Sequence, residues 1–415
     1  MIAPERLAAA VAAQRGLAER LFATLAEGSQ GDPGIMRDTY GAGEDFGHRV
    51  FAEAAAAADL TVTTDASLNT YATWRGSDPA APAILMGSHL DSVPHGGNFD
   101  GAAGVIAGLV TLAALRELGV RAEESVWFQV SYIGSRGALG TLPEGALEAR
   151  RIDTGRTLAD HIRDCGGDPE ALRRGERSLD PKRIRAFLEV HIEQAPSLVE
   201  AGFPIAVCTG IPGNFRYPAA SILGRYDHVG TPRRFRRDAA MAGMALAAEL
   251  DAIWAEHEAR GEGMAVTFGR FHTDSDKHGM TTVPGEFRFS LDVRAYDEAV
   301  LAGVEARMHA AIARIEAERG VVFELGARAS APVGPDDPGI RTALTQAAER
   351  LGIPAMPLGS PASHDSAAFA AAGVPVAMLF VRNEHGSHNP REAMAIDDFM
   401  AAATVLAQWV ADHAG

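Results

Sequence analysis

Histidine and carboxylate residues recur where short apolar runs of this chain end. His89 and Asp91 follow the run 83–87, and His191 lies at the end of the run 187–192. The full set is His89, Asp91, Asp100, His191, Glu193 and His388. Imidazole nitrogens and carboxylate oxygens are ligands that a borderline-soft ion such as Zn²⁺ accepts. One carboxylate can also bridge two ions about 3.5–4 Å apart, an arrangement suited to hydrolysis.

Each of these residues has a plainer interpretation when it is taken alone. A single histidine after a strand is more often a surface or hydrogen-bonding residue than a metal ligand. The combination is more specific, because His89 and Asp91 are followed by a glycine-rich loop that holds Asp100. That pattern is not a common arrangement of core residues, so the set as a whole favours a metal site.

The elements around these residues indicate an α/β fold. Apolar runs at 83–87, 187–192 and 374–380 predict buried strands, and a helical pattern over 102–118 ends at Gly119. In such folds the loops after the strands converge on the ligand site. Further helices are predicted over 5–26, 44–59, 143–151, 157–164 and 397–413, and short strands over 60–63 and 70–74.

Residues 217–332 have a different pattern. It reads as strand (219–226), helix (237–259), strand (264–272), strand (286–294), helix (297–318) and strand (320–327). An antiparallel sheet with two helices is near the ferredoxin-like arrangement. We therefore predict one catalytic domain, residues 1–213 and 333–415, interrupted by a smaller inserted domain over 214–332.

The overall charge excludes some classes of partner. Lys and Arg number 38 and Asp and Glu 54, which gives a formal net charge of −16. This balance argues against nucleic acid and against an anionic membrane surface. No segment has the length and apolar character of a membrane span. Two cysteines, Cys165 and Cys208, give no disulfide framework and fit a reduced, cytoplasmic setting.

Four segments resemble one known family. The segment Gly87–Pro94, with Gly96, Gly97, Asp100 and Gly101, looks like the first metal motif of the hydantoinase/carbamoylase amidases, which belong with the M20-type metallopeptidases. Three further segments match later motifs of that family: Leu188–Gln194, Leu291–Arg294 and Gly386–Pro390. The resemblance covers about residues 35–410. It implies an α/β catalytic domain with a central mixed sheet flanked by helices, and an inserted ferredoxin-like α+β domain for lid and dimerisation functions.

The resemblance also implies roles for single residues. His89, Asp100 and His191 would hold one divalent ion, Asp100 would bridge to a second ion, and His388 would bind that second ion. Asp91 would fix the ring of His89. The residues implied to bind a small substrate with a carboxylate group are Gln194, His228, Arg294 and Asn214. The ions would be Zn²⁺ or Mn²⁺, with Co²⁺ or Ni²⁺ as further options, and the chain would form a homodimer.

The family's Glu-Glu pair is displaced in this chain. Glu123 would be the general base and Glu124 a ligand of the second ion, but only residues 121 and 122 separate the pair from the loop at Gly119. A strand of five or six residues is missing before it. Either the sheet lacks that strand and the pair still reaches the ions, or residues 125–131 form the strand and the pair precedes it. In the second case Tyr132 and Ile133 stand where the pair belongs.

These features predict metal-dependent hydrolysis of a linear C–N bond in an N-carbamoyl or related N-acyl amino acid. The ions would lower the pKa of water, and Glu123 would accept its proton. One alternative is an M20-type dipeptidase or aminoacylase. The other is a catalytically impaired homologue that binds ligand without turnover, which the displaced Glu-Glu pair motivates.

Overall fold

The chain forms two compact units in this computed structural model. It describes residues 2–78, 80–119, 126–130, 132–151, 154–334 and 336–414, with the backbone alone for 126–130 and 132. Unit 2 is Gly210–Gly334, and unit 1 contains the chain on either side of it. The observed limits of unit 2 lie four residues before and two residues after the range 214–332 expected from the sequence.

Unit 1 is organised around a six-stranded mixed sheet. Its order is β14-β6-β15-β5-β3-β4. The strands are β3 (Ala83–Ser88), β4 (Val126–Val130), β5 (Ile184–Ile192), β6 (Ile205–Cys208), β14 (Ala355–Leu358) and β15 (Val376–Val381). β4, β3, β5 and β15 are parallel to one another, whereas β6 is antiparallel to β15 and parallel to β14. The predicted central mixed sheet is therefore confirmed.

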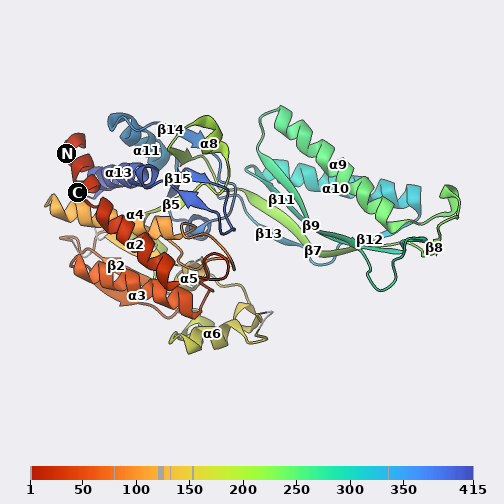
Figure 1. Cartoon of the computed structure of the whole chain (residues 1–415), viewed down its shortest axis with the longest axis horizontal. Helices are drawn as coiled ribbons and strands as arrows, with labels where there is room; N and C mark the ends of the chain where they lie inside the picture. Colours follow the sequence, from red (N-terminus) through yellow and green to blue (C-terminus); the bar gives the residue numbers. More distant parts are fainter. Residues whose placement is uncertain are drawn as a thin grey trace. The chain divides into compact units, whose positions relative to one another are not determined.

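Helices cover the unit 1 sheet (Figure 1). They are α1 (Pro4–Ala13), α2 (Arg15–Gly28), α3 (Ala42–Ala57), α4 (Ala102–Glu117), α5 (Tyr132–Ala138), α6 (Leu158–Asp164), α7 (Pro169–Arg173), α8 (Ser197–Ala201), α11 (Pro338–Arg350), α12 (Asp365–Ala371) and α13 (Ile396–His413). No described helix has both the length and the apolar character needed to span a membrane.

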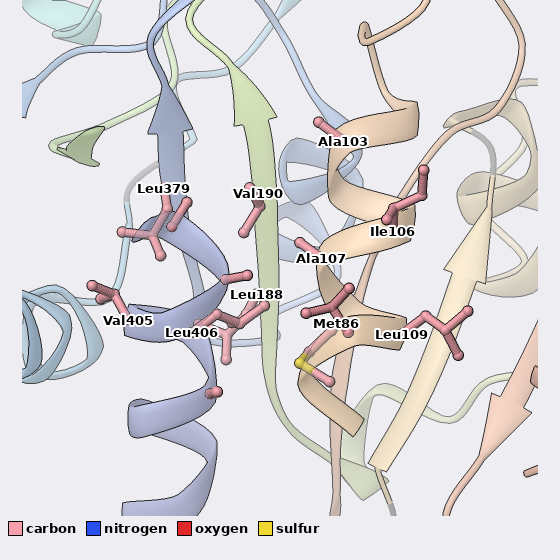
Figure 2. Packing of buried hydrophobic residues seen from close by; sticks show 14 of the residues in the cluster. Met86, Ala103, Ile106, Ala107, Leu109, Leu188, Val190, Leu379, Val405 and Leu406 are labelled. Carbon is pink, nitrogen blue, oxygen red and sulfur yellow. The ribbon is translucent and has the colours of Figure 1, made fainter. Parts of the chain in front are cut away.

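The largest core lies between the sheet and helices α4 and α13. Figure 2 shows Met86 of β3, Leu188 of β5 and Leu379 of β15 beside residues of these two helices, among them Ile106 and Leu406. The alternate strand residues, such as Leu85 and Phe187, belong to a second cluster that includes Phe369 of α12. Because both sheet faces are buried, the central strands are continuously apolar. This explains why the apolar runs of the sequence located them.

Unit 2 is an antiparallel sheet with two long helices. The strand order is β12-β7-β11-β9, and β13 also pairs with β7. The elements are β7 (Gly213–Leu223), β9 (Met264–Thr273), β11 (Glu286–Ala295), β12 (Val322–Glu324), β13 (Ala329–Ala331), α9 (Ala239–Ala259) and α10 (Glu298–Arg319). A short pair, β8 (Asp227–His228) with β10 (Thr282–Val283), extends from this sheet's connections. Side chains of α9 and α10 form one core with the sheet.

Several predicted boundaries were wrong. The single helix expected over 5–26 is two helices that meet at Gln14. The helix expected over 143–151 is only a 3₁₀ turn, Ala146–Glu148, because Gly145 before it has φ of 75° and interrupts a helix there. Several elements of unit 1 have no counterpart in the prediction, among them the strands β6 and β14 and the helices α11 and α12.

Candidate metal centre

The candidate ligands come from three neighbouring strands. His89 directly follows β3, His191 is the second-last residue of β5, and His388 follows β15 by seven residues. These strands are parallel, so their carboxyl ends lie at one edge of the sheet. Asp100 reaches this edge from the loop before α4. The next residue must be glycine, because a Cβ on Gly101 would lie 2.4 Å from the carbonyl oxygen of His89.

One oxygen of Asp100 is the meeting point of the cluster. Asp100 Oδ1 lies 3.1 Å from His191 Nε2 and 3.7 Å from His89 Nε2. The two Nε2 atoms are 3.5 Å apart. Asp100 and His191 are buried, with 5% and 1% of their surface exposed. Two ring nitrogens and one carboxylate oxygen, each a potential metal ligand, therefore face a common point that is largely shielded from solvent.

The spacing of these atoms fits a divalent cation. Two ligands of a tetrahedral ion with bonds near 2.0–2.1 Å are separated by about 3.3 Å. The measured separations of 3.1, 3.5 and 3.7 Å lie close to that value. Three protein ligands with a fourth position open is the arrangement of a catalytic site, whereas structural zinc sites use four. His89, Asp100 and His191 are thus able to hold one ion.

The second oxygen of Asp100 faces a different set of groups. His388 Nε2 lies 3.2 Å from Asp100 Oδ2, and Ser387 Oγ lies 3.4 Å from the same oxygen. Gln194 Nε2 donates to Asp100 Oδ1 at 3.1 Å. Gln194 and His388 both have left-handed backbones, with φ of 65° and 61°, which is uncommon for such residues. Asp100 therefore occupies the position from which a carboxylate can serve two ions.

The rings of His89 and His191 are held through the nitrogen that does not face Asp100. His89 Nδ1 lies 3.2 Å from Asp91 Oδ1 and 3.0 Å from the Asp91 carbonyl oxygen. Asp91 is itself held by the hydroxyl of Thr39. His191 Nδ1 donates to the carbonyl oxygen of Ile192 at 2.9 Å. When Nδ1 of each ring carries the proton and donates it in a hydrogen bond, Nε2 is unprotonated and can bind a metal ion beside Asp100.

The charges of the cluster are strongly coupled. Burial alone would raise the pKa of Asp100, but hydrogen bonds with His191 and His388 hold it far below its usual value. Burial alone would lower the pKa of His191, but the Asp100 carboxylate raises it. The hydrogen bond to Asp100 likewise raises the pKa of His388. The cluster therefore favours positive charge beside an ionised Asp100, and a divalent cation supplies that charge when the rings are neutral.

Two residues outside the predicted set tie the site loops together. Glu392 Oε1 accepts hydrogen bonds from the backbone N–H of Phe99 at 2.8 Å and of Asp100 at 3.2 Å, and its Oε2 accepts from Ser387 Oγ at 2.6 Å. It thereby joins the Asp100 loop to the His388 loop. Buried Arg37 donates to the Leu90 carbonyl at 2.7 Å, beside His89. Neither residue belongs to a recognisable motif, and the sequence carries no signal for these long-range contacts.

A second group of potential ligands lies behind His191. Glu189, His191 and His364 could also surround an ion. The oxygens of Glu189, however, already accept hydrogen bonds from Ser88 Oγ at 2.7 Å and from the backbone N–H of Ser366 at 2.9 Å. Its carboxylate therefore links β3, β5 and α12. We assign this group a supporting role for the strand ends.

The predicted base and its neighbour, Glu123 and Glu124, lie outside the described residues. The strand that follows them is described: β4 is parallel to β3 and pairs Val126 with Ile84 and Val130 with Ser88. Residues 126–130 thus form a strand beside β3, and this strand follows the Glu-Glu pair in the sequence. This agrees with the alternative in which residues 125–131 form the strand. Ile133, soon after the carboxyl end of β4, packs in an apolar cluster with Tyr40 and Leu147.

The remaining predicted substrate ligands lie in unit 2. Asn214 of β7 and Arg294 of β11 are directly opposite each other in the sheet. Arg294 donates to both oxygens of Asp292, at 3.0 and 3.3 Å, which fixes its guanidinium. His228 belongs to the separate pair β8-β10, opposite Thr282. The structure brings Asn214 and Arg294 together, and it places Gln194 alone of the four in the metal cluster of unit 1.

Comparison with known proteins gives the same family throughout. The model of peptidase family M20/M25/M40 matches residues 85–412. An N-carbamoyl-L-amino acid amidohydrolase of Geobacillus stearothermophilus is 35% identical over 94% of this chain and 96% of its own length. An allantoate amidohydrolase of Escherichia coli is 29% identical over 86% and 87%.

A solved structure extends the comparison to the whole fold. The hydantoinase/carbamoylase family amidase of Burkholderia ambifaria matches with a TM-score of 0.82 and 29% identity, over 97% of this chain and 98% of that one. The matched family model covers most of this chain, including all four candidate metal ligands described above. This chain belongs to peptidase family M20/M25/M40, among the hydantoinase/carbamoylase amidases.

Proposed function

We propose that this chain is a metal-dependent amidohydrolase that cleaves the ureido C–N bond of an N-carbamoyl amino acid. One observation carries the proposal: Nε2 of His89, Nε2 of His191 and Oδ1 of Asp100 lie within 3.1–3.7 Å of one another. The relative at 35% identity is named for this activity and spans almost the whole chain. A substrate of this class also carries a carboxylate, for which a fixed guanidinium is suited.

A divalent ion in this site supplies a Lewis acid that polarises the scissile carbonyl and lowers the pKa of water. The residues of the chain supply position. Asp91 and the Ile192 carbonyl hold the two histidine rings, and Glu392 holds the loop of Asp100. Burial of Asp100 and His191 excludes water from one side of the centre, which strengthens its electrostatic interactions.

Substrate recognition is assigned to residues of both units. Arg294, whose guanidinium is held by Asp292, would bind the substrate carboxylate, and Asn214 lies across from it in the sheet. Gln194 would contact the substrate at the metal cluster. His228 would polarise the scissile carbonyl. The family resemblance implies this role, and it implies that His228 acts in the site of the partner subunit of a homodimer. The dimer itself is part of this proposal.

The proton transfer is assigned to Glu123, and a second ion to Glu124 with Asp100 and His388. These roles rest on the family resemblance, since both glutamates lie outside the described residues. The ions proposed are Zn²⁺ or Mn²⁺, with Co²⁺ or Ni²⁺ as alternatives. We place the enzyme in the cytoplasm, where Cys165 and Cys208, which form no disulfide, would stay reduced.

Two other functions compete with this one. A dipeptidase or aminoacylase would use the same cluster on a peptide or acyl bond, and the family name allows it. An impaired homologue would bind ligand without turnover. It is favoured by the register of β4, which starts after the Glu-Glu pair.

Rates on three substrates separate these functions. The purified protein is loaded with Zn²⁺ or Mn²⁺ and given an N-carbamoyl-L-amino acid, allantoate and a dipeptide, with ammonia or free amine measured. We expect turnover of a ureido substrate, abolished by chelator, and none of the dipeptide. Turnover of the dipeptide alone would assign a peptidase. No turnover of any substrate by fully loaded protein would assign the impaired homologue.

A further inference from the structure

Unit 2 contains a large cavity with an unusual charge. Its volume is about 1200 Å³, and six arginines line it: Arg225, Arg233, Arg234, Arg236, Arg237 and Arg319. We call it the arginine pocket. Only two carboxylates line it, those of Asp238 and Glu318, so the lining carries 6 − 2 = +4 charges. The whole chain has a formal net charge of −16, so this cluster of positive charge is opposite in sign to the protein as a whole.

Backbone contacts fix part of the pocket without neutralising it. Arg236 Nε donates to the Thr231 carbonyl oxygen at 2.7 Å, and its Nη2 donates to the Val229 carbonyl oxygen. Arg225 donates to the Phe235 carbonyl oxygen at 2.9 Å and pairs with Asp227 at 3.0 Å. A carbonyl oxygen orients a guanidinium but leaves its positive charge in place. Both side chains are therefore held in position; Arg236 keeps its positive charge, whereas Asp227 balances the charge of Arg225.

The other arginines have little to balance them. Among the described residues, no carboxylate lies within ion-pair distance of Arg233, Arg234 or Arg237. The Nε of Arg319 is buried and has no hydrogen-bond partner. A buried donor without a partner costs roughly 1–3 kcal/mol. An acceptor group that entered the pocket would satisfy this donor and reduce the repulsion among the guanidinium groups.

The lining side chains also indicate the chemistry of the ligand. Phe235 also lines the pocket, with 54% of its surface exposed and the Arg234 guanidinium over its ring at 4.5 Å. Arginine forks match phosphate oxygens in pairs, and an exposed ring offers contact to an organic body. A cavity of this size holds a sizeable small molecule.

We propose that the arginine pocket binds a small molecule bearing a chain of two or more phosphate groups, such as a nucleoside di- or triphosphate. All of its lining residues belong to unit 2, and none of them is a candidate metal ligand. Nucleic acid is disfavoured as the ligand, because the arginines line one cavity and the rest of this acidic chain would repel a long polyanion.

Calorimetry on the full chain tests the proposal with two probes, inorganic tripolyphosphate and ATP. We expect saturable binding of both at low salt and weaker binding at physiological salt. The variant Arg233→Gln/Arg234→Gln should weaken binding about tenfold or more, since charge-assisted hydrogen bonds are lost. The matched control Arg270→Gln/Arg307→Gln removes two charges from residues of unit 2 that do not line the pocket and should change affinity less than about twofold.

The remaining measurements identify the site and the source of the phosphate. Binding should persist in Asp100→Ala, because that change affects only the metal centre. Tighter binding of ATP than of tripolyphosphate, lost in Phe235→Ala, indicates a nucleotide; equal binding indicates the phosphate chain alone. The proposal is overturned by absence of saturable binding or by unchanged affinity in Arg233→Gln/Arg234→Gln. A change of oligomeric state in that variant without any phosphate binding would assign the pocket to an interface between copies.

Discussion

The two sides of the metal centre are defined in different ways. On the side of β5 and β15, each site residue contacts another: Asp100 lies between His191 and His388, and Glu392 ties the loops together. On the side of β4, the side chains of residues 120–132 lie outside what the structure describes, and Ile133 packs into an apolar cluster. One half of the centre is thus fixed by contacts within the structure. The other half depends on where Glu123 and Glu124 lie.

This difference separates binding of a cation from its use in catalysis. His89, Asp100 and His191 can hold an ion without any residue from the β4 side, because their donor atoms already have suitable spacing. Hydrolysis needs in addition a group that accepts a proton from water. Variants on each side should therefore have different effects on metal content and on rate, and the predictions below begin with the largest effect.

The largest effect is expected for Asp100→Ala. This change removes the one carboxylate shared by the three histidines, and with it several kcal/mol of charge stabilisation. Activity on the ureido substrate should fall at least about 10³-fold, and bound metal should fall with it. Asp397→Ala, which removes an exposed carboxylate on α13, is the control and should leave both unchanged. Retained metal and retained rate in Asp100→Ala would exclude this cluster as the centre.

Glu123→Gln tests the other side. If Glu123 is the general base, the rate should fall about 10²–10⁴-fold while the metal content stays the same. Glu144→Gln, in the loop between α5 and α6, is the matched control. A rate that is unchanged in Glu123→Gln would show that another group accepts the proton, and the arrangement in which the pair reaches the ions would be wrong.

A smaller effect is expected for Glu392→Gln. Glutamine keeps the size of the side chain but weakens the hydrogen bonds that Phe99, Asp100 and Ser387 make to the carboxylate. Groups that orient metal ligands are typically worth about 10–100-fold in affinity or activity. Metal affinity, measured by competition with a chelator, should fall in this range. An unchanged affinity would reduce Glu392 to a residue that only stabilises the fold.

The smallest effect concerns the pH dependence of stability. Burial, with the nearby charge of Glu189, raises the pKa of Asp365 to about 7. A folded-state pKa above the unfolded value means that the folded protein binds the proton more tightly. The stabilising contribution is then present at low pH and is lost as pH rises through about 7.

Asp365→Asn should remove this dependence. In metal-free protein, the wild type should lose about 2 kcal/mol more of its unfolding free energy than the variant between about pH 5.5 and pH 8. Urea unfolding at the two pH values measures the difference. Parallel behaviour of the two proteins would show that Asp365 is not protonated in the folded state. Ser135, which donates to Asp365 at 2.5 Å, is unchanged in the comparison.

The sequence was informative where local pattern determines structure. Both faces of the central strands are buried, so their apolar runs located β3, β5 and β15, and the residues after them included His89, His191 and His388. The inserted domain was predicted because its helices and antiparallel strands follow one another locally. Short elements such as β6 and β14 are stabilised by distant neighbours, and their own residues carry too little pattern.

Contacts between distant segments could not be predicted in the same way. Glu392 meets Phe99 across 293 residues, and Ser135 meets Asp365 across 230. Such contacts depend on how the strands are ordered in the sheet, which no local pattern determines. The spacing of the Glu-Glu pair is a related case, because whether residues 125–131 form a strand depends on pairing with β3.

Metal content per chain tests the central claim most directly. Protein purified without chelator is compared with His191→Ala and with His95→Ala, which removes an exposed histidine of a nearby loop. We predict at least one divalent ion per chain in the wild type and in His95→Ala, and its loss in His191→Ala. Ions that remain bound in His191→Ala, or a wild type that binds none when Zn²⁺ and Mn²⁺ are supplied, would contradict a metal centre at the ends of β3, β5 and β15.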